Sequence, residues 1–396
     1  MSAPSTSSLP AIRGARIAQL IECDGPGGAE RIVALLAAGL QEAGCEVVAF
    51  LPAGGEGWLA AELAAAAIHV EYLPLERPMS LRLAQRLTGA LRRRRIDLAH
   101  SHEFTMACLG TWATRRARIP HLFTMHGGRY HATRLSRRLA LRAAASLSCP
   151  VAVSRTAADA LRRDLWLHAP VHVIPNGVRW TAVAVSTLRR ELGLDAEDRL
   201  VLAIGNLYPV KGHAVLLNAL AQLTADHPRL HVAIAGRGEL RSALAAQAQR
   251  LGLGTRVHLL GLRSDVPNLL AAADIVAHPS LSEGLPLALL EAMFAAKPIV
   301  ASATGDIPVA LNQGKAGLLV PPGSVDALAA GITTLLRSPV DATLLAAAAR
   351  ARAARLYDAA NMVEHYATLY HELLSGDSRP ARRAGLRDHA PSTASG

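Results

Sequence analysis

The sequence is poor in cysteine and aromatic residues, and both shortages narrow the class of protein. Its 396 residues include only four cysteines, which are widely separated and form no C-x-x-C pair: Cys23, Cys45, Cys108 and Cys149. A disulfide framework or a structural zinc site is therefore not expected, and a reducing compartment is the default. Half of the residues are apolar and only 4% are aromatic, in an alanine-, leucine- and arginine-rich style that suits a soluble α/β protein.

Several longer patterns are also missing. No run of about 18 uncharged apolar residues occurs, which argues against a transmembrane helix. The first residues lack the basic start and apolar core of a signal peptide, so we expect a cytoplasmic protein. No Asp-x-Asp occurs, so the divalent metal that such motifs bind is not expected and no cofactor is predicted. The absence of G-x-G-x-x-G counts against a dinucleotide fingerprint.

Positive charge is concentrated in one part of the chain. The net charge is +11, and residues 82–142 hold fourteen arginines against Asp97 and Glu103, so 14 − 2 gives +12 there. The segment lacks interleaved aromatics and any recognisable nucleic-acid motif, which disfavours nucleic acid as a partner. Two interpretations remain: a solvated helix face, or a surface for an anionic membrane. Leu83, Leu87 and Leu91 form a stripe that either inserts shallowly or packs on the core.

Apolar strand-like runs alternate with helical patterns throughout, which predicts α/β architecture with parallel sheets. Seven runs precede residue 178 and six follow it, so we expect two doubly wound halves facing a cleft at the carboxyl ends of their strands. The predicted organisation is a flexible N-terminus (1–15), an N-terminal Rossmann-like domain (16–178), a C-terminal one (179–356), a helix crossing back (357–376) and a disordered tail (377–396).

The segment EGLPLALLE carries glutamates at both ends of an apolar run. We expect Glu283 at or just before a helix N-terminus and Glu291 about two turns inside, roughly 12 Å away on the same face. The first helical N–H groups between them would hold an anion such as a diphosphate. Each carboxylate would then meet a hydroxyl-bearing group at one end of the ligand. For an isolated pair, a capping glutamate and a helix-surface glutamate are the usual explanation.

Other polar or glycine-rich turns fall at predicted strand ends. Gly27 and Gly28 let a ligand approach the backbone in the first turn. His100, His102 and His126 follow neighbouring strands and favour a polar site at the cleft, although any one of them could be structural. No acidic or cysteine partner stands at metal-ligand spacing, so zinc is not predicted.

Two turns in the second half add positive charge to the same sheet edge. Lys211 lies in the loop of AIGNLYPVKGH, where an ammonium group can meet a phosphate as a point charge. Arg237 lies in AGRGELR, another glycine-bracketed turn. Each turn is weak evidence alone, but both fall at the ends of successive strands just ahead of EGLPLALLE.

The ordered series GGAER, MHGG, VIPNGV, GNLYPVKGH, AGRGEL, EGLPLALLEAM, KPIVAS and GLLVPPGSVDALA resembles the retaining glycosyltransferases of family 4, which have the two-Rossmann-domain GT-B architecture. The resemblance covers residues 16–375. It implies transfer of a sugar from a UDP- or GDP-sugar to a hydroxyl acceptor, either lipid-linked or a small molecule. It also implies retained α-configuration and a role in building cell-surface polysaccharide or glycolipid at the inner face of the membrane.

The same resemblance implies roles for individual residues. Glu291 would bind the ribose hydroxyls and Glu283 the hydroxyls of the donor sugar. The N–H groups of Gly284 and Leu285 would hold the diphosphate, Lys211 would neutralise it, and His126 would face the transferred sugar. Gly27 and Gly28 would line the junction of donor and acceptor.

One position departs from the family pattern. Many members carry an arginine where this chain has Asn206, and asparagine supplies no charge, so Arg237 is the candidate to compensate. Two alternatives stay open at this point. One is another GT-B-like enzyme, such as an inverting transferase or a sugar-nucleotide epimerase; the other is a non-catalytic nucleotide-sugar-binding protein.

Overall fold

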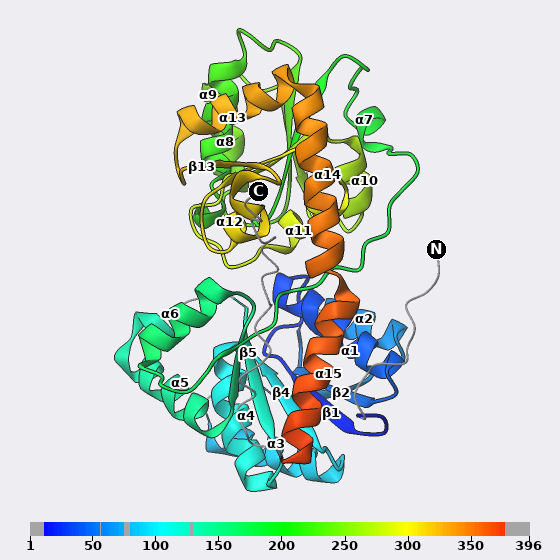
Figure 1. The fold of residues 1–396 in the computed structure, drawn as a ribbon, viewed down its shortest axis with the longest axis vertical. Coiled ribbons are helices and arrows are strands. Elements are labelled where there is room, and N and C mark those ends of the chain that lie inside the picture. The colour runs from blue at the N-terminus through cyan, green and yellow to red at the C-terminus, as the bar shows by residue number, and fades with distance from the viewer. Residues whose placement is uncertain (1–11, 56, 75–79, 127–129, 377–396) are drawn as a thin grey trace, which may run out of the picture.

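The computed structural model describes residues 12–55, 57–74, 80–126 and 130–376. The predictions of a flexible start and a disordered tail therefore lie largely outside the described residues. Two parallel sheets, each covered by helices, stack along the long axis of the molecule (Figure 1). The predicted α/β GT-B architecture is confirmed, because every run expected as a strand forms one and the two sheets are separate.

The N-terminal half is built on a 7-stranded sheet in the order β3-β2-β1-β4-β5-β6-β7, with every pair parallel. The strands are β1 (Arg16–Leu20), β2 (Glu46–Pro52), β3 (His69–Leu73), β4 (Leu98–His102), β5 (His121–Met125), β6 (Cys149–Ala152) and β7 (His172–Val173). The helices between them are α1 (Gly28–Glu42), α2 (Trp58–Ala65), α3 (Leu81–Arg93), α4 (Glu103–Ala117), η1 (Tyr130–Thr133), α5 (Leu135–Leu147) and α6 (Arg155–Leu165).

The C-terminal half is built on a 6-stranded parallel sheet in the order β10-β9-β8-β11-β12-β13. Its strands are β8 (Arg199–Ile204), β9 (Leu230–Ala235), β10 (Val257–Gly261), β11 (Ile275–His278), β12 (Ile299–Ser302) and β13 (Leu318–Val320). Its helices are α7 (Leu188–Glu191), η2 (Pro209–Lys211), α8 (His213–Leu223), α9 (Arg241–Arg250), α10 (Val266–Ala272), α11 (Leu287–Phe294), α12 (Ile307–Ala310), η3 (Asn312–Gly314), α13 (Val325–Arg337) and α14 (Pro339–Leu356).

The chain crosses between the two halves twice, near Val178 and near Tyr357, and the two crossings are hydrogen-bonded to each other. Val178 donates its N–H to the Tyr357 carbonyl at 2.8 Å, and Ala359 donates back to the Val178 carbonyl at 3.2 Å. Gly177 is required beside this pair, since a Cβ there would lie 2.7 Å from the Ala359 Cα. Asp358 then accepts from the Ala360 N–H and caps the last helix.

The last helix, α15 (Ala359–Ser375), belongs to the N-terminal half. It continues from α14 down the side of the first sheet (Figure 1). Tyr357 packs in a core of the C-terminal half, whereas Met362, Tyr366 and Tyr370 pack with residues of β1, α1 and β2. The crossing is thus made at the junction of α14 and α15, and α15 itself completes the core of the N-terminal half.

The arginine-rich segment forms α3, α4 and α5, which lie side by side on one face of the sheet. Leu83, Leu87 and Leu91 are at most 2% exposed, so the predicted leucine stripe packs on the core and the alternative of membrane insertion is wrong. Within the described residues, every helix is too short or too polar to cross a lipid bilayer.

Candidate active site

An ion pair joins two loops at the carboxyl edge of the second sheet. Lys211 ends η2, which follows β8, and its Nζ lies 2.5 Å from Oε1 of Glu283, which follows β11. The Ser280 hydroxyl donates to the same Oε1 at 2.9 Å. Gly212 allows this approach, because its φ is +67° and a Cβ there would lie 2.0 Å from the Pro279 carbonyl oxygen. Lys211 and Glu283, which were predicted for separate roles in one site, are therefore in direct contact.

The loop after Glu283 presents free N–H groups. Within the described residues, the N–H groups of Gly284 and Leu285 donate no hydrogen bond, whereas both carbonyls accept one, from Asp306 N and Asn176 Nδ2. The helix begins later than predicted, at Leu287, so Glu291 lies little more than one turn inside it. The physical reason is Pro286, which has no N–H and disfavours helical backbone at the residue before it.

Glu291 is buried, and among the described residues only one of its two carboxylate oxygens has a hydrogen-bond partner. Its Oε1 lies 3.1 Å from Nη1 of Arg31 on α1, while its Oε2 is buried and has no hydrogen-bond partner in the part of the chain that the structure describes. Burial raises the pKa of the Glu291 carboxyl, and the Arg31 guanidinium opposes that shift. An unpartnered buried carboxylate oxygen is costly, so this atom is suited to accept a ligand hydroxyl. The sequence reasoning missed Arg31, which stands in GGAER at the cleft end of α1.

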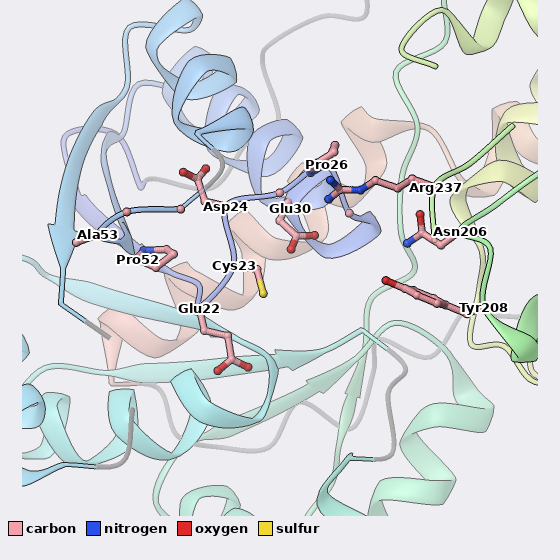
Figure 2. Close-up of a pocket in the computed structure, with 14 residues that line it drawn as sticks. Glu22, Cys23, Asp24, Pro26, Glu30, Pro52, Ala53, Asn206, Tyr208 and Arg237 are labelled. Atoms are coloured by element: carbon pink, nitrogen blue, oxygen red, sulfur yellow. The ribbon is translucent and has the colours of Figure 1, made fainter. Parts of the chain in front are cut away.

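A cavity of about 450 Å³ lies between the halves. Figure 2 shows Asn206, Tyr208 and Arg237 of the C-terminal half facing Glu22, Cys23, Pro26 and Glu30 of the N-terminal half. Arg237 comes beside Asn206 because the Leu207 N–H donates to the Arg237 carbonyl at 2.8 Å. Of the predicted site residues, the described wall contains Gly27, Asn206 and Arg237. Gly28 begins α1 next to it, whereas Lys211, Glu283, Glu291 and His126 lie outside the wall.

His126 follows β5 and is held by a neighbouring histidine. Its Nε2 lies 2.9 Å from Nδ1 of His102, and its backbone N–H donates to Glu103. Its Nδ1 is buried and has no hydrogen-bond partner among the described residues. Burial lowers the pKa of His126 to about 4, so the ring is neutral at pH 7. His100 does not join the cleft as predicted. It is fully buried, and it bonds Tyr370 and Thr124 instead.

Glu103 is a polar residue of the site that sequence reasoning passed over. Its backbone has a φ of +66°, a conformation that a residue with a side chain adopts at a cost. Burial raises the pKa of its carboxyl to about 7, and the charges of Glu22 and Glu30 add to the shift. The available signal was its position directly after β4, in AHSHEF.

The buried histidines make the fold sensitive to acid. Burial lowers the pKa of six of them below the ordinary value: His100, His102, His121, His126, His213 and His278. Below about pH 6.5 the unfolded chain takes up protons that the folded chain cannot, so each histidine costs about 1.4 kcal/mol of stability per pH unit. Glu103 and Glu291 act in the opposite direction, because their raised pKa values favour the folded form as pH falls.

Because six histidines act against two glutamates, we expect the melting temperature to fall steadily from pH 7 to pH 5. Thermal melts followed by circular dichroism across this range measure the effect. An equal melting temperature at both ends of the range would contradict it.

Two Rossmann-like halves, with a lysine–glutamate pair and free loop amides at the facing strand ends, define the GT-B class of glycosyltransferase. Comparison with protein families agrees. The model of glycosyl transferases group 1 matches residues 185–354, and that of glycosyltransferase family 4 matches residues 26–179. The chain belongs to the glycosyltransferases that these two models describe.

Its relatives include the D-inositol 3-phosphate glycosyltransferases of Mycobacterium marinum, at 35% identity over 209 residues, and of Corynebacterium jeikeium, at 38% over 147 residues. These matches cover 50% and 35% of this chain. The chain spans less than half the length of these relatives, 44% and 35%.

Solved structures match over most of the chain. Anabaena Alr3699/HepE in complex with UDP-glucose has 27% identity and a TM-score of 0.79, covering 90% of this chain and 99% of that one. Sucrose-phosphate synthase of Thermosynechococcus elongatus has 23% identity and a TM-score of 0.78, covering 91% and 100%. The second likeness concerns the fold alone.

Proposed function

We propose that the protein is a retaining glycosyltransferase that moves a sugar from a UDP- or GDP-sugar to a hydroxyl acceptor. The observation that carries the proposal is the Lys211–Glu283 pair beside two free loop amides, with the unpartnered Oε2 of Glu291 on the following helix. Cation, N–H donors and carboxylate are the groups that a diphosphate flanked by two sugars requires. The likeness to a structure that holds UDP-glucose favours a UDP-sugar as the first donor to test.

The chemistry follows from where charge develops. Cleavage of the anomeric bond leaves positive charge on the sugar and negative charge on the departing diphosphate. Lys211 and the N–H groups of Gly284 and Leu285 stabilise the diphosphate in the transition state. Glu283 must then exchange part of its contact with Lys211 for the donor sugar hydroxyls. Arg237 supplies the charge that Asn206 lacks, and the proposed reaction requires no divalent metal.

The acceptor hydroxyl attacks on the face from which the diphosphate leaves, so the α-configuration is retained without an enzyme nucleophile. The oxygen–carbon bond to the acceptor forms as the bond to the diphosphate breaks, and the acceptor proton passes to the leaving diphosphate. Anomeric configuration of the product, read by NMR, separates this proposal from an inverting transferase.

A thermal-shift panel of UDP-, GDP- and ADP-sugars tests the donor. A ligand that binds only the folded protein raises its melting temperature. We expect one UDP- or GDP-sugar to raise it, and the same sugar to have a smaller effect on Glu291→Ala. Strong stabilisation by a donor without transfer to any acceptor would favour the non-catalytic alternative, and no stabilisation by any of them would contradict the proposal.

For the acceptor, we propose a lipid-linked hydroxyl compound at the inner face of the cell membrane, in the building of surface polysaccharide or glycolipid. The arginines differ in position relative to the cleft. Arg82 and Arg134 lie at the beginnings of α3 and α5, which follow the carboxyl ends of their strands, beside the exposed Leu81, Leu135 and Leu139. We propose that these two arginines and three leucines, which lie at the cleft end of the N-terminal half, face the bilayer.

Apart from Arg86 in the middle of α3, the remaining exposed arginines of α3 and α4 lie at the opposite edge of the sheet, where these two helices end. Arg93 and Arg94 there pair with Glu71 at 3.0 and 2.8 Å, so part of this charge is already balanced. A membrane contact through these residues would turn the cleft away from the bilayer. We assign them to the solvated surface.

We expect salt-sensitive co-sedimentation with vesicles that contain phosphatidylglycerol and none with neutral vesicles. Each arginine at the surface contributes about 1 kcal/mol, screened by salt. Arg82→Gln/Arg134→Gln should weaken binding about tenfold or more, whereas the matched variant Arg115→Gln/Arg118→Gln should not. Absence of binding at low salt would make the basic face a solvated surface and a soluble acceptor the better hypothesis.

A further inference from the structure

A chain of buried side chains runs from His126 to the last helix. His126 Nε2 lies 2.9 Å from His102 Nδ1, and His102 Nε2 lies 2.8 Å from the carbonyl oxygen of Gln19 on β1. The Gln19 amide donates to the Tyr370 hydroxyl at 3.3 Å. That hydroxyl lies 2.7 Å from Nδ1 of His100. Gln19, His100 and His102 are completely buried.

The position of each proton in the first part of this chain follows from Gln19. Its carbonyl oxygen can only accept, so His102 carries its proton on Nε2. His102 is neutral because it is buried, so its Nδ1 is bare and accepts from His126 Nε2–H. The neutral His126 ring then has no proton on Nδ1, the atom that is buried without a partner.

We propose that Gln19 and His102 are positioning residues that hold His126 in the Nε2–H tautomer and so present its unprotonated Nδ1 to the transferred sugar. The inference rests on the proposed function and on the role that the family resemblance implies for His126, which is to face that sugar. A lone pair there accepts a sugar hydroxyl and attracts the positive charge that develops on the ring. An N–H in its place would repel this charge, so the tautomer acts on the transition state more than on donor binding.

Rotation of the Gln19 side-chain amide would produce the opposite tautomer of His126. Turning the Gln19 amide by 180° would make it a donor to His102, and the proton on His102 would move to Nδ1. His126 would then carry its proton on Nδ1 and leave a buried N–H without an acceptor, which is rarer in proteins than an under-satisfied acceptor. In the observed orientation the Tyr370 hydroxyl of α15 accepts from the Gln19 amide and can donate to Nδ1 of His100, so both contacts are satisfied.

Nitrogen-15 NMR of the histidine-labelled protein reads the tautomer directly, with the His126 signals assigned by their loss in His126→Gln. In the wild type we expect a protonated Nε2 and a bare Nδ1. In Gln19→Leu we expect a mixture of tautomers, a kcat lower by about 10-fold to 100-fold and a donor KM changed less than about twofold. Tyr370→Phe is the milder variant, with a smaller change in the same direction.

Ser148→Ala is the matched control. It removes a 2.7 Å hydrogen bond to a buried histidine of the same sheet, His121, which is not connected to His126. We expect it to lose stability without changing the His126 tautomer or kcat. The proposal is overturned if wild-type His126 carries its proton on Nδ1, if the tautomer shifts in Gln19→Leu with kcat unchanged, or if kcat falls equally in the control.

The two proposals fail in different ways. The tautomer is measured by NMR on the free protein, without a donor. The tautomer assignment is therefore tested independently of catalytic activity. Absence of donor binding in the thermal-shift panel would remove the proposed function while leaving the tautomer assignment intact.

Discussion

Lys211→Ala is expected to lower kcat more than it raises the donor KM. The Lys211 ammonium lies 2.5 Å from the Glu283 carboxylate, so its charge is already partly balanced within the protein. Negative charge on the diphosphate grows as the anomeric bond breaks, and the attraction is therefore greatest in the transition state. We expect a loss of about 2–4 kcal/mol, on the order of 30-fold to 1,000-fold in kcat/KM.

Steady-state kinetics with the donor found in the thermal-shift panel measure this effect. Lys211→Arg keeps the charge with a different shape and should recover part of the activity. Lys315→Ala removes an exposed lysine before β13 and should leave both constants unchanged. If Lys211→Ala raised KM alone, Lys211 would be a binding residue and the assigned role in leaving-group departure would be wrong.

Glu291→Ala is expected to weaken donor binding with little effect on kcat. Its buried Oε2 has no hydrogen-bond partner among the described residues, and a ribose hydroxyl at that atom would be held equally in the ground state and the transition state. Removal of such a contact acts on affinity. We expect a loss of about 2–4 kcal/mol in donor binding, measured by isothermal titration calorimetry with the nucleoside diphosphate.

Arg31 couples this contact to the other half of the molecule. Arg31→Ala leaves the Glu291 carboxyl buried without its ion pair, so the pKa of Glu291 rises further and the charged acceptor is lost in part. We expect weaker donor binding, and the double variant should lose less than the sum of the two single losses. Glu364→Ala, an exposed carboxylate on α15, is the control. Unchanged affinity in Glu291→Ala would remove it from the site.

The strands and the Lys211–Glu283 pair could be predicted because they depend on local patterns. Apolar runs bounded by turn residues predict buried parallel strands, and parallel strands bring their carboxyl ends to one edge, so residues after β8 and β11 meet. The start of α11 could have been placed better from the sequence, since Pro286 stands in the motif and excludes helix at Leu285.

The partners of the site residues could not be predicted in the same way. Arg31 and Glu291 come from different halves, and their contact depends on how the two sheets are placed. Gln19 lies in the apolar strand RIAQL, where one glutamine indicates nothing until β4 and α15 pack against it. The same holds for Leu83 and Leu91, whose spacing fits a membrane face and a core face equally well until α3 packs on the sheet.

The placement of α15 bears on how the protein is made. Tyr366 and Tyr370 are at most 1% exposed in the core built around β1 and α1. These two tyrosines lie far from β1 in the sequence, since the hydrogen bond between Gln19 and Tyr370 spans 351 positions. During synthesis the N-terminal half emerges first, with the groove for α15 open and apolar. It cannot close its core until the C-terminal half has left the ribosome. Each newly made molecule therefore passes through a stage in which the N-terminal half has an incomplete core and an exposed apolar groove. Binding of a chaperone to that groove would protect the chain from aggregation at this stage.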